Sequence, residues 1–258
     1  MSALVEVQRD GRMAVVRMAR PPANAINSEM CQALLATIDE LEADEEIDGA
    51  ILAGRLGMFS AGLDVIELYK LDAAAMAAFW SEFTEVFLRL FGSSLSWVAA
   101  IEGHAPAGGC VLALACDHRV MADGRYKIGL NEVAIGLAVP RWLTRVHASV
   151  VGRRRSERML QLGKMSSSAE ALAAGLVDEV VVAESVIDRC REELSIRLSV
   201  PQMARHATKM AMRGDLLVDI HEESGQDGQA LLQSWYGEEC RQSMGRLIEK
   251  LGGGDGRS

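Results

Sequence analysis

Short apolar runs alternate with helical stretches through the first half of this sequence, and the alternation constrains the fold more than any other feature. The runs at 47–53, 97–101 and 118–122 hold mostly small or branched apolar residues, as buried strands do. The stretches at 72–91 and 107–116 separate them and are predicted to be helices. Strands joined through helices pair in parallel by right-handed crossovers, so we expect an α/β fold around a parallel sheet.

The two ends of the chain extend this pattern. Asp10-Gly11 follows one apolar run and precedes another, which predicts a hairpin because both central residues of a type I′ turn need positive φ. Ser28 is predicted to cap a helix that runs to about Glu45. Beyond about residue 140 the sequence becomes mainly helical, with long helices expected at 201–212 and 226–251. No long linker interrupts the chain, so we expect one folded unit with a core at 1–195 and a helical C-terminal region at 196–258.

Charge and composition argue against several classes of function. The chain has 258 residues, 49% of them apolar, and its net charge of −9 does not favour nucleic acid or anionic membranes as partners. No apolar stretch approaches the roughly 20 residues that cross a bilayer, and the first residues lack the pattern of a signal peptide. Five scattered cysteines without a CxxC pair indicate reduced thiols. We therefore expect a cytoplasmic protein.

Two glycine-bearing segments follow predicted strand ends. In 59–64 a small-residue turn leads from a strand toward a helix, and in 106–111 Pro106 is predicted to lie in the first turn of a helix beside Gly108 and Gly109. The first N–H groups of a helix lack internal acceptors, and glycine lets a ligand approach them. Glycines that merely allow close helix packing are an equal alternative for the second segment alone. Together the two segments predict an oxyanion hole, because such a hole needs donors from two loops.

Glu132 is the candidate acid or base. It lies in Ile128–Ile135, where almost every neighbour in sequence is apolar, and burial raises a carboxyl pKa toward the working pH of a general base. A glutamate that only satisfies N–H groups at a helix start is equally compatible with this segment. Cys110, Cys116 and His118 could suggest a metal site, but no fourth ligand follows at zinc-like spacing, so we predict no metal.

The sequence contains a series of short motifs: Asn24-Ala25, Phe59–Asp64, Gly108-Gly109-Cys110, Cys116–Arg119, Gly129-x-x-Glu132 and Ala173–Asp178. From about Arg17 to about Val182 they resemble the crotonase, or enoyl-CoA hydratase/isomerase, superfamily. The resemblance implies a crotonase (ClpP-like) fold of repeated ββα units, a C-terminal region that forms homotrimers or hexamers, and an acyl-CoA substrate. Coenzyme A would be part of that substrate, so no separate cofactor is implied.

The resemblance also implies roles for single residues. The N–H groups of Leu63 and Gly108 would form the oxyanion hole for the thioester, and Glu132 would be the catalytic acid and base. A set of residues beside these groups would bind the coenzyme A portion: Ser60, Ala61, Gly62, Leu63, Asp64, Gly108 and Asn131.

Val111 bears on the reaction. Hydratases of this family generally carry one glutamate at this position and another at the position of Glu132, because two carboxylates hold and polarise the water that is added. Isomerases can work with one glutamate. The sequence resembles the mitochondrial-type Δ3,Δ2-enoyl-CoA isomerase branch in segments 106–110, 128–132 and 140–143. Arg141 departs from that pattern, because an apolar residue is usual at this position. We therefore expect an isomerase of fatty-acid β-oxidation. The alternatives are a hydratase, another acyl-CoA reaction such as decarboxylation or hydrolysis, and a non-catalytic acyl-CoA-binding subunit.

Overall fold

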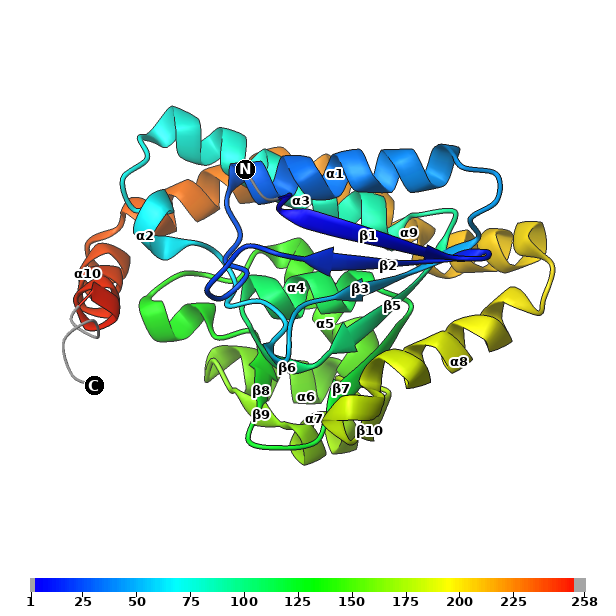
Figure 1. Cartoon of the computed structure of the whole chain (residues 1–258). Coiled ribbons are helices and arrows are strands. Elements are labelled where there is room, and N and C mark those ends of the chain that lie inside the picture. Colours follow the sequence, from blue (N-terminus) through cyan, green and yellow to red (C-terminus); the bar gives the residue numbers. More distant parts are fainter. Residues whose placement is uncertain (1–2, 253–258) are drawn as a thin grey trace.

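A computed structural model describes residues 3–252, apart from the side chains of 223–227 and 251–252 (Figure 1). Strands form a six-stranded sheet in the order β1-β2-β3-β5-β7-β10 and a four-stranded sheet in the order β4-β6-β8-β9. The larger sheet consists of β1 (Val5–Asp10), β2 (Met13–Met18), β3 (Gly49–Ala53), β5 (Ser96–Ile101), β7 (His118–Ala122) and β10 (Glu179–Val181). The smaller sheet consists of β4 (Gly57–Met58), β6 (Gly103–Pro106), β8 (Lys127–Gly129) and β9 (Ser166–Ser167).

The larger sheet confirms the predicted hairpin and the predicted parallel pairing. β1 pairs antiparallel with β2, and Asp10 lies opposite Met13 across the turn. From β2 onward the neighbours β3, β5, β7 and β10 all pair in parallel. Helices cover both faces of this sheet, which explains why its central strands read as continuous apolar runs.

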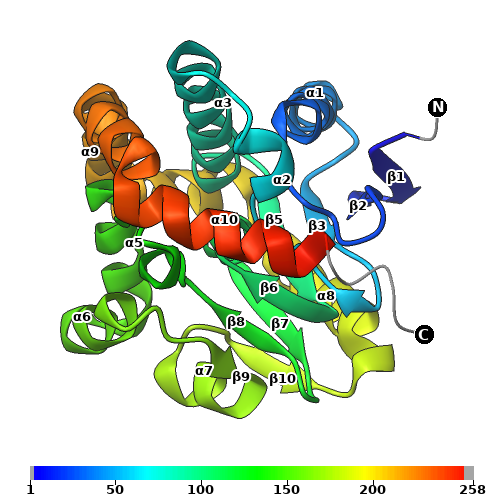
Figure 2. The same cartoon turned by 90° about the vertical axis from the view of Figure 1, so that its left-hand side faces the viewer.

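Helices lie on two sides of the larger sheet (Figures 1 and 2). On one side α8 packs against β3, β5 and β7, where Val98, Ala100 and Leu194 belong to one buried cluster. The opposite face contributes Ala50, Leu52 and other residues to the larger core beneath α1, α3 and α4. The helices are α1 (Ser28–Ala43), α2 (Val65–Leu68), α3 (Ala73–Phe91), α4 (Gly108–Ala115), α5 (Arg141–Val151), α6 (Arg153–Gln161), α7 (Ser168–Ala174), α8 (Val186–Leu198), α9 (Gln202–Tyr236) and α10 (Glu238–Gly252), with 3₁₀ turns η1 (Glu132–Ile135) and η2 (Ala183–Ser185).

The same order of elements recurs along the chain. A strand of the larger sheet is followed by a strand of the smaller sheet and then by helical structure, as in β3-β4-α2-α3, β5-β6-α4 and β7-β8-η1-α5. This order confirms the expected repeated ββα units. The segments that follow β4, β6 and β8 lie at one cavity, which Ala61, Ala107 and Asn131 line.

Two helix starts differ from the prediction. The cap of α1 is Asn27 rather than Ser28, since its side-chain oxygen accepts from Met30 N at 3.0 Å. Pro106 ends strand β6 instead of lying in the first helical turn, and α4 begins at Gly108 after Ala107. Ala107 has a φ of +44°, a conformation that costs a non-glycine residue about 1–3 kcal/mol and that is found mainly at functional sites.

The C-terminal helices also differ from the prediction. One continuous helix, α9, covers the first predicted stretch, the residues that follow it and the second stretch as far as Tyr236. The rest of the second stretch forms a separate helix, α10, which begins at Glu238 after Gly237. α9 packs against α3 and α5, and its buried Ile220 and Trp235 belong to the same core as the N-terminal helices. This packing offsets the roughly 1 kcal/mol that an internal glycine such as Gly214 costs a helix. α10 then crosses to contact η1 and α2 (Figure 2).

Candidate active site

The two glycine segments lie directly against each other. Gly62 has a φ of +83°, and a Cβ at this position would lie 2.9 Å from Pro106 O and 3.1 Å from Gly108 N. A Cβ on Gly109 would lie 2.7 Å from Ser60 O. Real Cβ atoms do not approach backbone atoms this closely, so glycine at both positions lets the 59–64 loop contact the start of α4.

The backbone around Leu63 is fixed by a parallel bridge to Ile26. Ile26 N donates to Gly62 O and Asp64 N donates to Ile26 O, both at 2.8 Å. In such a bridge the N–H of the middle residue, here Leu63, points away from the partner strand. The N–H of Leu63 is therefore directed away from the segment around Ile26 and is not used in the bridge.

Gly108 supplies the second candidate donor. It is the first residue of α4, so its N–H has no acceptor within the helix and lies at the positive end of the helix dipole. The preceding Ala107 N is already used, because it donates to Gly129 O at 2.8 Å. A Cβ on Gly108 would lie 3.2 Å from Leu63 Cδ2, which places the two candidate donor residues side by side.

A cavity of about 970 Å³ opens beside these donors. Ala61, Leu63, Asp64 and Gly108 line it. Ser60 and Gly62 lie behind the lining: Ser60 Oγ donates to Asn24 O at 2.7 Å and accepts from Gly62 N at 3.1 Å. The remaining wall is largely apolar and comes from α3, α5, α9 and neighbouring segments, including Trp80, Phe83, Leu88, Leu137, Trp142, Leu143, Leu231 and Trp235.

Glu132, the first residue of η1, lines the same cavity and is 8% exposed. Burial raises its pKa from 4.5 to about 7, because the charged form loses solvation. Its Oε2 and the neighbouring Asn131 Oδ1 are buried without a hydrogen-bond partner among the described residues. A carboxylate held in this way is able to accept and return a proton near neutral pH.

Only one carboxylate is buried in this cavity, as far as the described residues show. Of the three carboxylates in its lining, Glu85 is exposed and Asp64 forms an ion pair with Arg20 at 2.7 Å. Val111 is 2% exposed and contributes an apolar side chain to the same wall. The arrangement can move a proton, but it lacks the second buried carboxylate that would hold a water for addition.

Sequence reasoning missed several residues of the cavity. Arg20 lies at its polar side, where it contacts Asp64 and also donates to Ala25 O at 3.0 Å. Its position before Pro21 gave no hint of this role. The apolar wall residues had only helical spacing as a signal, which is equally typical of any buried helix face.

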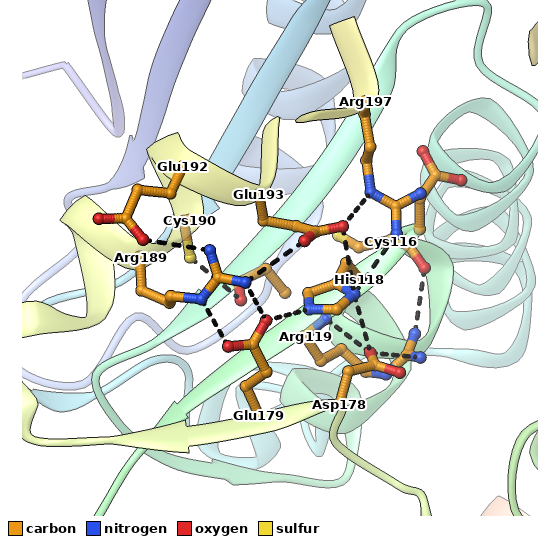
Figure 3. Close-up of polar contacts among 12 residues, drawn as sticks. Cys116, His118, Arg119, Asp178, Glu179, Arg189, Cys190, Glu192, Glu193 and Arg197 are labelled. Atoms are coloured by element: carbon orange, nitrogen blue, oxygen red, sulfur yellow. Dashed lines mark hydrogen bonds and ion pairs between the residues drawn. The ribbon is translucent and has the colours of Figure 1, made fainter. Parts of the chain in front are cut away.

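The residues considered for a metal site do not form one. Cys116 is buried, and burial raises the pKa of its thiol to about 12. His118 instead lies with Glu179 and Glu193, and these three place ligand atoms within 4.8 Å of one another. Both carboxylates are engaged by arginines, however: Glu179 accepts from Arg189 at 2.5 and 2.8 Å, and Glu193 pairs with an arginine of α8 (Figure 3). The cluster is an ion-pair network that ties α8 to β7 and β10.

Comparison with known proteins agrees with this geometry. A family model described as enoyl-CoA hydratase/isomerase matches residues 8–252. The chain belongs to the enoyl-CoA hydratase/isomerase family. The mitochondrial enoyl-CoA delta isomerase 1 of Mus musculus is 38% identical over 96% of this chain and 86% of its own length. A probable enoyl-CoA hydratase of Mycobacterium tuberculosis is 30% identical over 80% of this chain and 78% of its own length.

A solved structure supports the same assignment within the enoyl-CoA hydratase/isomerase family. Human mitochondrial delta3-delta2-enoyl-CoA isomerase superposes with a TM-score of 0.95 at 36% identity, covering 98% of this chain and all of that one. The expected crotonase fold and the resemblance to the mitochondrial-type isomerase branch are therefore confirmed.

Proposed function

We propose that this family member is a Δ3,Δ2-enoyl-CoA isomerase, which moves the double bond of a 3-enoyl-CoA thioester to the 2-position. The observation that supports this most is one buried carboxylate, Glu132, in a cavity where Val111 occupies the place of a second. Both the mouse relative and the human structure named above carry isomerase in their names.

The reaction needs one base and one site for negative charge. The N–H groups of Leu63 and Gly108 donate to the thioester oxygen, and Glu132 removes a proton from C2. The C2–H electron pair enters the conjugated enolate, whose oxygen is stabilised by the two donors and by the positive end of α4. Glu132 then returns the proton to C4, which leaves the double bond between C2 and C3.

Different parts of the cavity wall contact the two parts of the substrate. The backbone of Ala61, Leu63 and Asp64 lies along the coenzyme A portion, together with Asn131. Ser60 and Gly62 shape this loop from behind. The acyl chain occupies the apolar lobe between α3, α5 and α9. Coenzyme A is part of the substrate, and neither a metal nor a separate cofactor takes part in this reaction.

Ultraviolet absorbance tests the proposal directly. Purified protein is mixed with a 3-enoyl-CoA, and growth of the conjugated 2-enoyl thioester is followed while the product mass is checked. Absorbance that grows without a change of mass supports isomerisation. If a 2-enoyl-CoA instead gains the mass of water, the protein is a hydratase and Val111 does not prevent hydration. Binding of both thioesters without turnover identifies a non-catalytic acyl-CoA-binding subunit.

The rate should depend on pH through Glu132. Its carboxylate must be ionised to remove the C2 proton, and its pKa is raised to about 7. We therefore expect kcat/KM to fall about tenfold for each pH unit below 7 and to level off above it. Rates measured between pH 5 and 9 check this, and a profile that is flat down to pH 5 would contradict the assignment of Glu132 as the base.

The C-terminal region 196–258 is the proposed oligomerisation region, giving a homotrimer or hexamer. Large apolar side chains are exposed at the end of α8 and in the first half of α9, including Ile196 at 60% and Met203 at 86%. An exposed set of this kind is typical of a surface that another subunit covers.

The double variant Ile196→Glu/Met203→Glu should reduce the mass of the particle to that of one chain, because charges do not pack in an apolar interface. Light scattering after size exclusion measures the mass. Leu162→Glu is the matched control, since Leu162 is 76% exposed but lies outside the C-terminal region. An unchanged mass in the double variant would place the subunit contact elsewhere.

The structure and the relatives bear on the cellular location in two ways. The described part of the chain has no helix with the length and hydropathy of a membrane span. The mammalian relatives carry the word mitochondrial in their names. The cytoplasmic location expected from the sequence stays a prediction, which imaging of the tagged protein in its own cells tests.

A further inference from the structure

A second cavity, of about 260 Å³, lies at the opposite ends of the strands from the acyl-CoA site. Asp117 immediately precedes β7, and residues 94–96 lead into β5. The rest of the wall comes from the end of α8 and the first half of α9. It is rich in nitrogen-bearing side chains: Arg197, Arg205, His206, Lys209 and Arg213.

Three of these cations share one helix face. Arg205, Lys209 and Arg213 follow one another at intervals of four residues on α9, which places them in a row. Lys209 Nζ and a terminal nitrogen of Arg213 both lie 3.0 Å from Asp117 Oδ1. The other oxygen of Asp117 accepts from Trp97 N at 2.8 Å and from Lys209 Nζ at 3.1 Å. Two cations thus share a single carboxylate.

Arg205 has no carboxylate partner among the described residues. It donates to the carbonyl oxygens of Arg197 and Val200 at 2.8 and 3.2 Å and lies 3.5 Å from that of Asp48. The Asp48 carboxylate is itself paired with Arg12. Arg205 therefore adds one positive charge, and Lys209 and Arg213 together exceed the single charge of Asp117 by another. Among the described residues, two positive charges at the cavity thus have no counter-charge.

The remaining members of the wall do not supply that counter-charge. Arg197 is already balanced, because it pairs with Glu193 at 2.9 Å and lies beside the His118 ring (Figure 3). His206 has a ring nitrogen, Nδ1, that is buried without a partner among the described residues. Burial leaves the charged forms of Lys209, Arg205 and Arg213 poorly solvated, which lowers the pKa of each group.

We propose that this cavity binds a small oxyanion of the phosphate class, held by Arg205, Lys209 and Arg213. Guanidinium forks match the oxygens of a tetrahedral anion, and the lysine adds a point charge. The cavity is several times the roughly 30 Å³ that one water occupies in the liquid, so an anion with a few waters fits. The chain as a whole has a net charge of −9, so the positive charge of this cluster is a local feature of the cavity.

The anion would join the first half of α9 to the starts of β5 and β7. It shares no lining residue with the acyl-CoA cavity, which uses the second half of α9. Its effect should therefore appear in stability rather than in turnover, and the proposal does not depend on the reaction that the first cavity catalyses.

The test is a phosphate titration of the thermal midpoint, with sodium chloride at matched ionic strength and pH as the reference. We expect a saturable rise that is specific to phosphate, of about 3–5 °C at ten times Kd. Arg205→Gln should abolish the specific rise. Arg153→Gln, at an exposed arginine of α6, should keep it. A rise that is equal in both salts, or that persists in Arg205→Gln, overturns the proposal.

Two further measurements separate phosphate binding from a loss of folding and from a subunit contact. Arg205→Lys keeps the charge but loses the fork, so it should fold and bind phosphate several-fold more weakly, which calorimetric titration with phosphate measures. The alternative source of oxygens is a carboxylate from a second copy of the chain. If phosphate has no specific effect while Arg205→Gln lowers the particle mass in light scattering, a subunit contact fills the cavity and the proposal is wrong.

Discussion

Replacing Glu132 with glutamine is expected to lower isomerase turnover by roughly 10²–10⁴-fold, the usual contribution of a positioned acid and base. Glutamine has nearly the same shape, so the cavity wall stays in place, but an amide cannot take a proton from C2. Steady-state rates with a 3-enoyl-CoA measure the loss. Binding of the thioester should change little, because the donors of Leu63 and Gly108 are untouched. A variant with wild-type turnover would remove Glu132 from the mechanism.

The same substitution should stabilise the protein at alkaline pH. Glu132 has a pKa of about 7 in the folded chain and 4.5 as its ordinary value, so the folded state holds the proton more tightly. The tighter binding of the proton stabilises the folded state; this stabilisation is fully present below pH 4.5 and is lost as the pH rises through 7. Glutamine has no charge to bury, so Glu132→Gln should gain up to roughly 3 kcal/mol over the wild type at pH 8 and little at pH 4.

Urea unfolding at the two pH values checks this second effect. A gain at pH 8 together with lost turnover would show that the site accepts lower stability in order to hold an ionisable base. A loss of stability at pH 8 would mean that the carboxylate has a stabilising partner, and the raised pKa would then be wrong.

Gly62→Ala is expected to lower kcat/KM by about 10²-fold or more, the scale of removing one oxyanion donor. The added Cβ would lie 2.9 Å from Pro106 O and 3.1 Å from Gly108 N, so the 59–64 loop and the start of α4 must move apart. The two donors that converge on the thioester oxygen then separate. Rates with a 3-enoyl-CoA measure the effect.

Gly57→Ala is the matched control for this variant. Gly57 has a φ of +86°, close to the +83° of Gly62, but a Cβ there meets nothing within 4 Å. Both variants should lose about 1–2 kcal/mol of stability from the left-handed backbone, whereas only Gly62→Ala should lose activity. Equal losses of activity in the two variants would show that backbone strain, and not the contact with α4, is responsible.

The larger sheet could be predicted from the sequence because its strands are long and apolar. The strand predicted at 118–122 matches β7, and the strand predicted at 97–101 starts one residue late. The smaller sheet was missed because its strands are two to four residues long and include Gly57, Gly103 and Pro106. Such segments have no hydrophobic period, and their pairing depends on contacts between distant units.

The site could be predicted only in part for a similar reason. Gly62, Gly108 and Glu132 carry signals because backbone approach and proton transfer need those residue types. Cavity walls such as Leu137 and Trp235 need only be apolar, which many residues satisfy. The cations of the second cavity did carry a signal in their four-residue spacing, but its meaning depended on Asp117, about ninety residues away.

The walls of the acyl-CoA cavity run from Arg20 to Leu247, and this span matters when the protein is made. While a ribosome adds α9 and α10, which takes roughly 3–10 s, the earlier helices have emerged without their last neighbours. Until Trp235 is available, Trp80 lacks the edge-to-face contact that it makes with that ring in the folded chain, and the apolar wall that also includes Phe83 and Trp142 is incomplete. Chaperones that hold exposed apolar surface would act on this nascent chain during that interval.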